Sequence, residues 1–203
     1  MAVRRHLAVL LVLLATAAAV VALARGHHAP PEPRSAAQVQ APLPDAADAD
    51  YARMMIAHHA QAVRMSKDLL ARPGVPDRVA DIARFIVADQ QREIDQLSAW
   101  LAAWRLDADG AHEHGMLAPA DLTRLRQAPA AQAVPLYLHL MIKHHLGAID
   151  MSWALLNGGG QNVFLHSVAK HVINEQTAEN AAMTALLPGP GPDPAPGLTR
   201  PRP

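Results

Sequence analysis

The chain has 203 residues, and its 18 Lys and Arg residues balance 18 Asp and Glu residues, so the formal net charge is zero. Without a basic excess, the composition argues against a nucleic-acid-binding protein. The absence of cysteine excludes disulfide bonds, thiolate metal sites and a cysteine nucleophile. Aromatic residues amount to only 3%, and the abundance of alanine, leucine and methionine favours helices over sheets.

Residues 1–25 have the pattern of an export signal. Arg4 and Arg5 precede an uncharged run that extends from Leu7 to Ala24. The run is long for the core of a signal peptide and just short of a comfortable membrane span. We therefore expect either a cleaved signal peptide or an uncleaved N-terminal membrane anchor. In both cases the rest of the chain lies outside the cytoplasm, as a periplasmic, secreted or outward-facing anchored protein.

Two segments without apolar periodicity flank the region that is expected to fold. Residues 26–49 are rich in proline and alanine and are expected to form a disordered linker. Residues 188–203 are rich in proline and glycine and are expected to form a disordered tail. The folded domain is therefore predicted to span residues 50–187.

The predicted domain contains an internal repeat with a constant offset of 86 residues. The stretch MMIAHHAQAVRMS at residues 54–66 corresponds to LMIKHHLGAIDMS at residues 140–152. Two further pairs keep the same register without a gap: Gln90 with Gln176, and Glu93 with Glu179. A constant offset across both segments predicts that the domain consists of two copies of one structural unit.

Each unit is predicted to be a helical hairpin, the first at residues 50–105 and the second at 133–187. The predicted helices span about residues 50–71, 77–104, 119–127, 133–156 and 161–187. Pro73 and Gly74 break the first hairpin at its turn, and the run Gly158–Gly159–Gly160 breaks the second. Two antiparallel hairpins are expected to pack into an all-α four-helix bundle.

The histidine pairs lie on the helix faces that are predicted to be buried. Residues spaced by three or four positions share one face of a helix. On the first helix these positions are Tyr51, Met55, His58, Ala62 and Met65, and their counterparts in the second unit are Tyr137, Met141, His144, Ala148 and Met151. His58 and His144 are therefore predicted to face the core, with His59 and His145 at the flank of that face.

Polar residues also interrupt the apolar faces of the second and fourth long helices. They are Gln90 and Glu93 in the first unit, and Gln176 and Glu179 in the second. Burying a carboxylate without a partner is costly, so these residues need partners within the bundle. A turn near Gly74 would place Gln90 level with His58, and Glu93 level with Met55. The same argument places His144 level with Gln176, so the polar residues converge at one height.

Two interpretations account for this polar layer. In the first, hydrogen bonds between its members satisfy one another and fix the register of the helices. In the second, the layer binds a metal ion. Imidazole suits copper, zinc and iron, whereas thioether sulfur selects copper(I), so histidine with methionine favours copper over zinc or iron. A di-iron centre is disfavoured, because Met55 and Met141 stand where its Glu-x-x-His motif needs glutamate.

Four stretches of the sequence share a wider resemblance: MMIAHHAQAVRMS, IVADQQREIDQLSAWL, LMIKHHLGAIDMS and INEQTAENAAM. Together they resemble an exported bacterial family known as domain of unknown function 305, over about residues 50–187. The resemblance implies a ferritin-like fold, and some members are similar to periplasmic copper-binding proteins. The ligands that it implies are His58, His59, His144, His145, Met55, Met65, Met141 and Met151. Ala60 and Leu146 replace a glutamate that often follows the histidine pair, which would alter metal binding if that carboxylate orients a histidine.

The sequence supports three functional hypotheses. In the first, an extracytoplasmic protein without enzymatic activity sequesters copper through these histidines and methionines. Glu93 and Glu179 would be further ligands, and Gln90 and Gln176 would complete the polar layer. In the second, the bundle is a structural or protein-interaction module whose layer only sets register. In the third, it is a redox enzyme with a bound metal ion. A homodimer is compatible with all three.

Overall fold

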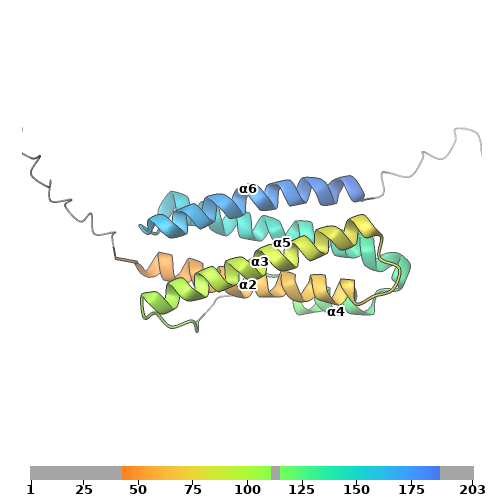
Figure 1. Ribbon diagram of the computed structural model, residues 1–203, viewed down its shortest axis with the longest axis horizontal. Coiled ribbons are helices and arrows are strands. Elements are labelled where there is room, and N and C mark those ends of the chain that lie inside the picture. Colours follow the sequence, from red (N-terminus) through yellow and green to blue (C-terminus); the bar gives the residue numbers. More distant parts are fainter. Residues whose placement is uncertain (1–42, 111–114, 188–203) are drawn as a thin grey trace, which may run out of the picture. The chain divides into compact units, whose positions relative to one another are not determined.

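The computed structural model describes residues 43–110 and 115–187, and this part of the chain is all-α (Figure 1). Its helices are α2 (Ala46–Leu70), α3 (Asp77–Ala103), α4 (Pro119–Gln127), α5 (Ala130–Gly158) and α6 (Val163–Leu186). The predicted export signal, most of the predicted linker and the predicted C-terminal tail lie outside the described residues. Among the described helices, none combines the length and the apolar character that crossing a membrane requires.

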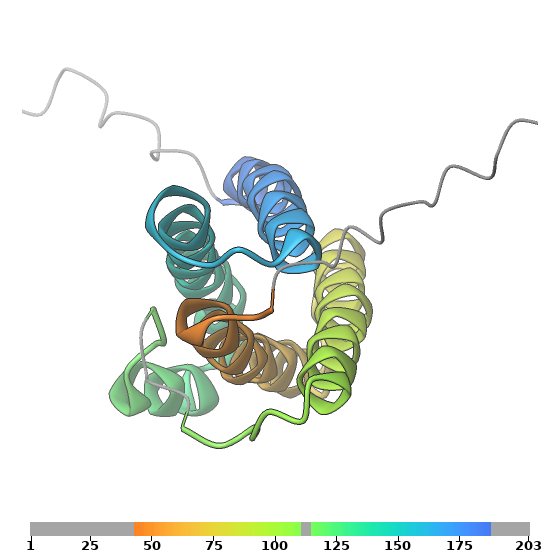
Figure 2. The same ribbon diagram turned by 90° about the vertical axis from the view of Figure 1, so that its left-hand side faces the viewer.

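Two helical hairpins build a ferritin-like four-helix bundle (Figures 1 and 2). α2 packs along α3 in the first hairpin, and α5 packs along α6 in the second. The hairpins meet mainly through α2 and α5, while α3 and α6 approach each other less closely. The short helix α4 packs on α5, outside the four-helix core. The arrangement confirms the predicted fold class.

The first helix begins earlier than the sequence pattern predicts. Asp45 accepts a hydrogen bond from the Asp48 amide (3.0 Å), and Asp48 accepts one from the Asp45 amide (3.1 Å), a capping box that starts α2 at Ala46. The end of the predicted linker is therefore helical. The buried Asp48 carboxylate also accepts hydrogen bonds from the amides of Gln161 (3.1 Å) and Asn162 (3.2 Å). These bonds join the starts of α2 and α6, at the end of the bundle that faces the viewer in Figure 2.

The turn between α5 and α6 depends on glycine. α5 begins at Ala130, before its predicted start, and continues through Gly158. Gly160 has a φ of +71°, a left-handed conformation that favours glycine. A Cβ atom at Gly160 would also lie 2.5 Å from Oδ1 of Asp48. Gly160 therefore both turns the chain and leaves room for the carboxylate that joins α2 to α6.

A layer of polar side chains divides the apolar core into two clusters. The first cluster contains Tyr51, Met55 and Met151, and the second contains Met65 and Met141. Between the clusters, every long helix contributes two residues to this polar layer. They are His58 and His59 from α2, Gln90 and Glu93 from α3, His144 and His145 from α5, and Gln176 and Glu179 from α6. All eight side chains are buried, which agrees with the polar layer expected from the sequence.

Candidate metal centre

Two stacked histidines join the hairpins within the polar layer. The rings of His58, from α2, and His144, from α5, have centroids 3.6 Å apart and an interplanar angle of 29°. Both side chains are fully buried. His58 Nε2 also lies 3.2 Å from the carbonyl oxygen of Gly115, in the segment that follows α3. The two hairpins therefore bring one histidine of each pair into direct contact.

The second histidine of each pair faces a glutamate of its own hairpin. His59 Nε2 donates a hydrogen bond to Glu93 Oε2 over 2.7 Å. His145 Nε2 lies 2.6 Å from Glu179 Oε2, a contact that is equally short but less well aligned for a hydrogen bond. Adjacent residues of a helix point about 100° apart. Each histidine pair thus directs one ring toward the other hairpin and one ring toward its own.

The pairing within each hairpin differs from the predicted pairing by one helical turn. The sequence predicts that Met55 is level with Glu93 and that His59 lies at the flank of the core face. In the structure Glu93 contacts His59, which is fully buried. Side chains lean toward the N-terminus of their own helix. In this antiparallel hairpin, α2 side chains lean away from the turn and α3 side chains lean toward it, so contacts join residues that are one turn out of level.

Two reciprocal hydrogen bonds flank the polar layer. The Tyr51 hydroxyl lies 3.0 Å from the Ser152 hydroxyl, and the Ser66 hydroxyl lies 2.8 Å from the Tyr137 hydroxyl. The two tyrosines are 86 residues apart in sequence, and so are the two serines. The same bond therefore occurs twice, with the roles of α2 and α5 exchanged.

The environment of the polar layer keeps His144 neutral. Burial lowers the pKa of His144 well below the ordinary value of 6.5, and the three other histidines of the layer lower it further. His144 is therefore neutral near pH 7, and neutral imidazole is the form that binds metal ions. Burial also raises the pKa of Tyr51 and the pKa of Tyr137, so both phenols keep their protons near neutral pH.

Several buried polar atoms of the layer have no hydrogen-bond partner. They include Nδ1 of His59 and His145, Oε1 of Glu93 and Glu179, and both side-chain amide atoms of Gln90 and Gln176. Buried polar groups in native proteins are normally hydrogen-bonded, and those that are not need an ion, a water molecule or a functional explanation. Imidazole nitrogen and carboxylate oxygen are ligand atoms for transition metals. The layer therefore offers buried ligand atoms that its own hydrogen bonds do not use.

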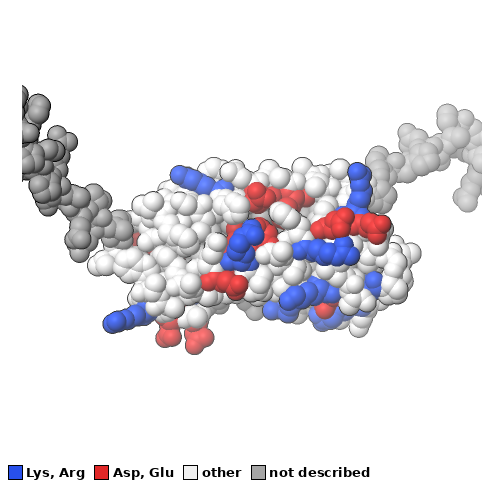
Figure 3. Space-filling model, in the orientation of Figure 1, with Lys and Arg blue, Asp and Glu red and all other residues white. Residues whose placement is uncertain are grey.

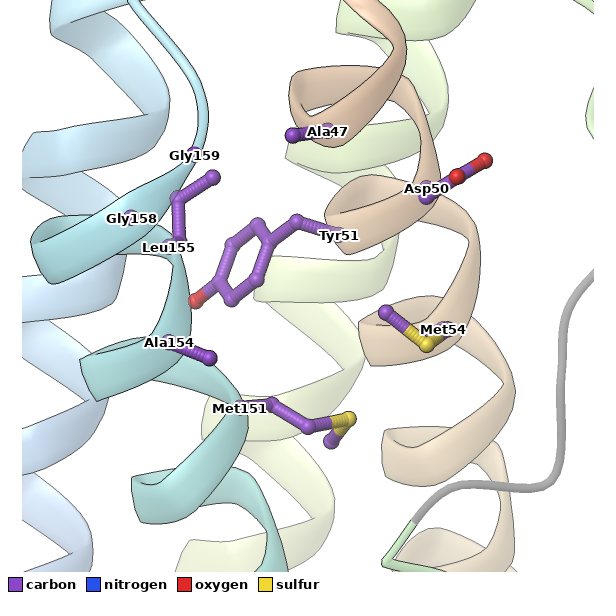
Figure 4. Close-up of a pocket in the computed structure, with 9 residues that line it drawn as sticks. All are labelled: Ala47, Asp50, Tyr51, Met54, Met151, Ala154, Leu155, Gly158 and Gly159. Carbon is purple, nitrogen blue, oxygen red and sulfur yellow. The ribbon is translucent and has the colours of Figure 1, made fainter.

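The predicted methionine ligands are buried on both sides of the layer. Met55 and Met151 belong to the first apolar cluster, and Met65 and Met141 belong to the second. Met151 also lines a pocket of about 570 Å³ between α2 and α5 (Figure 4). In Figure 4 the side chains of Met54, from α2, and Met151, from α5, both point into the space between these helices. Met65 lines a smaller pocket between α2 and α4, so two of the four predicted methionines are adjacent to a pocket as well as to the core.

A segment outside the four long helices covers one side of the polar layer. Gly115 lies against Gly147 of α5, where an added Cβ would come within 2.6 Å of the Gly115 carbonyl oxygen. The Leu117 amide donates to Gln61 Oε1 (2.8 Å), and Gln61 Nε2 donates to the Leu117 carbonyl (3.2 Å). A glycine inside a helical pattern often has a packing reason. Gly147, two residues after the second histidine pair, is the sequence signal for this contact.

Two residues that were not predicted as ligands extend the layer toward the surface. Asp89 lies one turn before Glu93 on α3, and His171 approaches from α6 with its Nε2 3.7 Å from Glu93 Oε1. One ligand atom from each of the three residues lies within 4.8 Å of the others. His171 lies close to Asp89 and Glu93 because of the way in which α3 and α6 cross. No motif in the sequence specifies that crossing.

Four-helix bundles with histidines and carboxylates on their inner faces form a recognised class of proteins that hold ligands in the core. The fold makes this chain a four-helix bundle, and buried histidines and carboxylates lie on its inner faces. The model of the DUF305 family, described as a domain of unknown function, matches residues 48–187, so the chain belongs to this family.

Solved structures of similar proteins share the fold. A DUF305 fragment from Deinococcus radiodurans is 25% identical, with a TM-score of 0.66, and the match covers 71% of this chain and 97% of that one. A DUF305 protein from Streptomyces coelicolor, described as a candidate secreted protein, is 27% identical, with a TM-score of 0.63 and coverage of 69% and 91%. CopM in its Cu(I)-bound form is 27% identical, with a TM-score of 0.58 and coverage of 68% and 93%. No curated protein matches the chain.

Proposed function

We propose that the protein binds copper outside the cytoplasm and sequesters it in the layer of four histidines. The observation that carries the proposal concerns His59 and His145, each of which faces a buried glutamate through Nε2 and has no partner at Nδ1. A carboxylate that holds one imidazole nitrogen orients the ring and makes the other nitrogen a better metal ligand. This arrangement occurs twice, next to the stacked rings of His58 and His144.

Copper fits this set of ligands better than other metals do. Imidazole nitrogen binds copper, and thioether sulfur selects copper(I). Met55, Met65, Met141 and Met151 supply thioethers immediately above and below the layer. CopM, which has a similar fold, has been solved with Cu(I) and with Cu(II). Zinc and iron also bind imidazole and are the alternatives. In this proposal the metal ion is the cargo of the protein.

The two positions that depart from the family pattern lie outside the proposed site. Leu146 is 52% exposed, and Ala60 is partly exposed, whereas the histidines that precede them are fully buried. A glutamate at either position would therefore have access to solvent. We accordingly assign the ligand role to the buried histidines, with the carboxylates of Glu93 and Glu179 as their partners or as further ligands.

Two observations support a location outside the cytoplasm. Residues 1–25 have the sequence pattern of an export signal, with two arginines before a long uncharged run. The similar protein from Streptomyces coelicolor is described as a candidate secreted protein. A copper-binding protein in this location would capture ions before they enter the cytoplasm.

A structural or protein-interaction module is the alternative that one observation favours. The hydrogen bond between His59 and Glu93 shows that members of the layer can satisfy each other. A layer of this kind could fix helix register without a metal ion. It would, however, leave Nδ1 of His59 and His145 and Oε1 of Glu179 buried and unpaired, which is costly, whereas a metal ion could take these atoms as ligands. We therefore prefer the metal-binding proposal.

The test is a titration of the purified protein with Cu(I), Cu(II) and Zn(II), in which melting temperature and bound stoichiometry are measured. An ion that binds only the folded state stabilises it by about 2.7 kcal/mol at a free concentration of 100 times the dissociation constant. A saturable rise in melting temperature with copper is the expected result. This rise in melting temperature should be absent in the double variant His58→Ala, His144→Ala.

His139→Ala is the matched control for the double variant. His139 lies on α5 as His144 does, but it is exposed, and its ring hydrogen-bonds to the backbone carbonyl of Pro135. This control should bind copper as the unmodified protein does. Unchanged copper affinity in the double variant would exclude the histidine layer as the site. No response to any of the three ions would favour the structural alternative.

A further inference from the structure

We infer that Asp89, Glu93 and His171 form a second metal site, which takes a divalent ion such as Zn²⁺ or Cu²⁺ at the surface where α3 and α6 meet. We call these three residues the outer site. Its ligand atoms lie within 4.8 Å of one another. The inference does not depend on copper binding by the histidine layer.

The outer site is open to solvent on one side and buried on the other. Asp89 and Glu93 are one turn apart on α3, so their carboxylates share a face of that helix. Both are buried, whereas the His171 side chain is 48% exposed. A hydrated ion could therefore reach the imidazole first and exchange its water for buried carboxylate oxygens. Figure 3 shows acidic and basic side chains interspersed on the face that α3 and α6 form.

An unpaired carboxylate oxygen points to a ligand at this site. Glu93 Oε2 is occupied by its hydrogen bond with His59, but Glu93 Oε1 is buried and has no hydrogen-bond partner. His171 Nε2 is the nearby nitrogen, and at 3.7 Å it is too far for a hydrogen bond. Zinc–nitrogen and zinc–oxygen distances of roughly 2.0–2.2 Å place two ligands of a tetrahedral ion about 3.4 Å apart. The observed separation is close to the one that a shared metal ion would impose.

The local charge also favours a cation. Burial raises the pKa of Asp89, and the neighbouring charges of Glu93 and Glu179 raise it further. The charges of Arg92 and His171 oppose this rise. Arg92 forms an ion pair with Asp89, but its side chain is 59% exposed and can move into solvent. A divalent ion would compensate the two carboxylates more directly than this exposed side chain does.

The second half of the bundle lacks the nitrogen ligand. At the offset of 86 residues, Asp89 corresponds to Glu175 and Glu93 to Glu179, but His171 corresponds to Phe85. Phe85, Glu175 and Glu179 line a surface pocket of about 450 Å³ between α3 and α6. Next to the two corresponding carboxylates, this pocket therefore has an aromatic ring where the outer site has an imidazole. The comparison predicts one outer site per chain rather than two.

The ligand set selects the class of ion. One imidazole with two carboxylates suits Zn²⁺ or Cu²⁺, and without a sulfur ligand it does not select Cu⁺. The small number of oxygen ligands and the presence of imidazole disfavour Ca²⁺ and Mg²⁺. Because Glu93 also holds His59, one carboxylate links an ion at the outer site to the histidine layer.

The experiment exchanges the residues that distinguish the two halves. Zn²⁺ is titrated into the full chain and into the variants His171→Phe and Phe85→His, with affinity and stoichiometry measured by calorimetry. We expect His171→Phe to lose one zinc ion, with at least about tenfold weaker affinity at that site, because losing a ligand costs at least as much as losing its outer partner. Phe85→His should gain one ion next to Glu175 and Glu179. His139→Phe, an exposed histidine on α5, is the control and should bind zinc normally.

Cu⁺ binding and circular dichroism are measured on the same variants. Cu⁺ affinity and the helical signal should be unchanged in His171→Phe, since His171 is half-exposed and lies outside the histidine layer. Unchanged zinc stoichiometry and affinity in a folded His171→Phe protein would overturn the outer site. The unmodified protein could instead fail to bind Cu⁺ but still bind zinc in a way that depends on His171. That result would contradict the proposed copper function alone.

Discussion

The imidazole rings of His58 and His144 stack with their centroids 3.6 Å apart, so two helices of different hairpins share a contact between ionisable side chains. Neither ring reaches solvent. A proton on one ring would be buried next to the other ring without water to stabilise it. His144 is therefore more stable in its neutral form, and this preference makes the polar layer sensitive to acid.

The first prediction is that the protein loses stability as the pH falls below about 6.5. The pKa of His144 is well below its ordinary value of 6.5, so below that pH the unfolded chain binds a proton that the folded chain does not. The free energy of unfolding should then fall by up to about 1.4 kcal/mol per pH unit, until the pH reaches the lowered pKa. Urea denaturation at a series of pH values measures the slope. The slope should be smaller in His144→Gln, and equal slopes would show that another group is responsible.

The second prediction separates the roles of the two glutamates. Glu93→Gln and Glu179→Gln each remove the carboxylate that faces a histidine, so both should weaken copper binding by about tenfold to a hundredfold. Only Glu93 belongs to the outer site, so only Glu93→Gln should also weaken zinc binding. Competition with a copper chelator and zinc calorimetry measure the two effects. Equal zinc affinities in the two variants would argue against a role of Glu93 at the outer site.

The third prediction concerns the close approach of Gly115 to Gly147. An alanine at Gly147 would place its Cβ 2.6 Å from the Gly115 carbonyl oxygen, so the covering segment would have to move. We expect Gly147→Ala to lower the free energy of unfolding by about 1–3 kcal/mol. Gly158→Ala is the control on the same helix, because nothing lies within 4 Å of a Cβ there. It should be neutral or stabilise the protein by up to about 1 kcal/mol. Similar losses in both variants would mean that close packing is not the cause.

The fourth prediction tests competition between Arg92 and the metal ion for Asp89. Arg92→Ala removes the ion pair with Asp89 and should tighten zinc binding at the outer site by up to about fivefold, because the arginine of this pair is exposed to solvent. Arg84→Ala removes a similarly spaced exposed ion pair with Asp81 on the same helix and is the control. Zinc calorimetry at low ionic strength is the measurement. Weaker zinc binding in Arg92→Ala would show that Arg92 supports the site instead of competing for it.

Much of the bundle could be predicted because local rules decide it. Spacings of three and four residues place His58 and Met55 on one face, and both side chains are buried. Pro73 and Gly74 predict the first turn, and α2 ends at Leu70 just before them. The start of α2 was predicted too late, because the reciprocal capping by Asp45 lies in a segment whose composition indicates a linker.

The contacts between helices could be predicted only in part, because they depend on how helices cross and how side chains lean. A hairpin turn fixes which residues are level, but the lean of the side chains joins Glu93 to His59 rather than to Met55. The stacking of His58 on His144 depends on the packing of α2 against α5, and no turn connects these helices directly. His171 approaches Glu93 where α3 and α6 meet, and no residue spacing in the sequence predicts this contact.

The hydrogen bonds of Asp48 have a mechanical consequence. Any pull applied to the chain from its N-terminal side enters the described fold at the first turn of α2. There Asp48 holds the amides of Asp45, Gln161 and Asn162 together, so the load passes to the start of α6 as well as to α2. Tension would be shared between the two hairpins at their common end, instead of peeling the first helix away from the rest of the bundle.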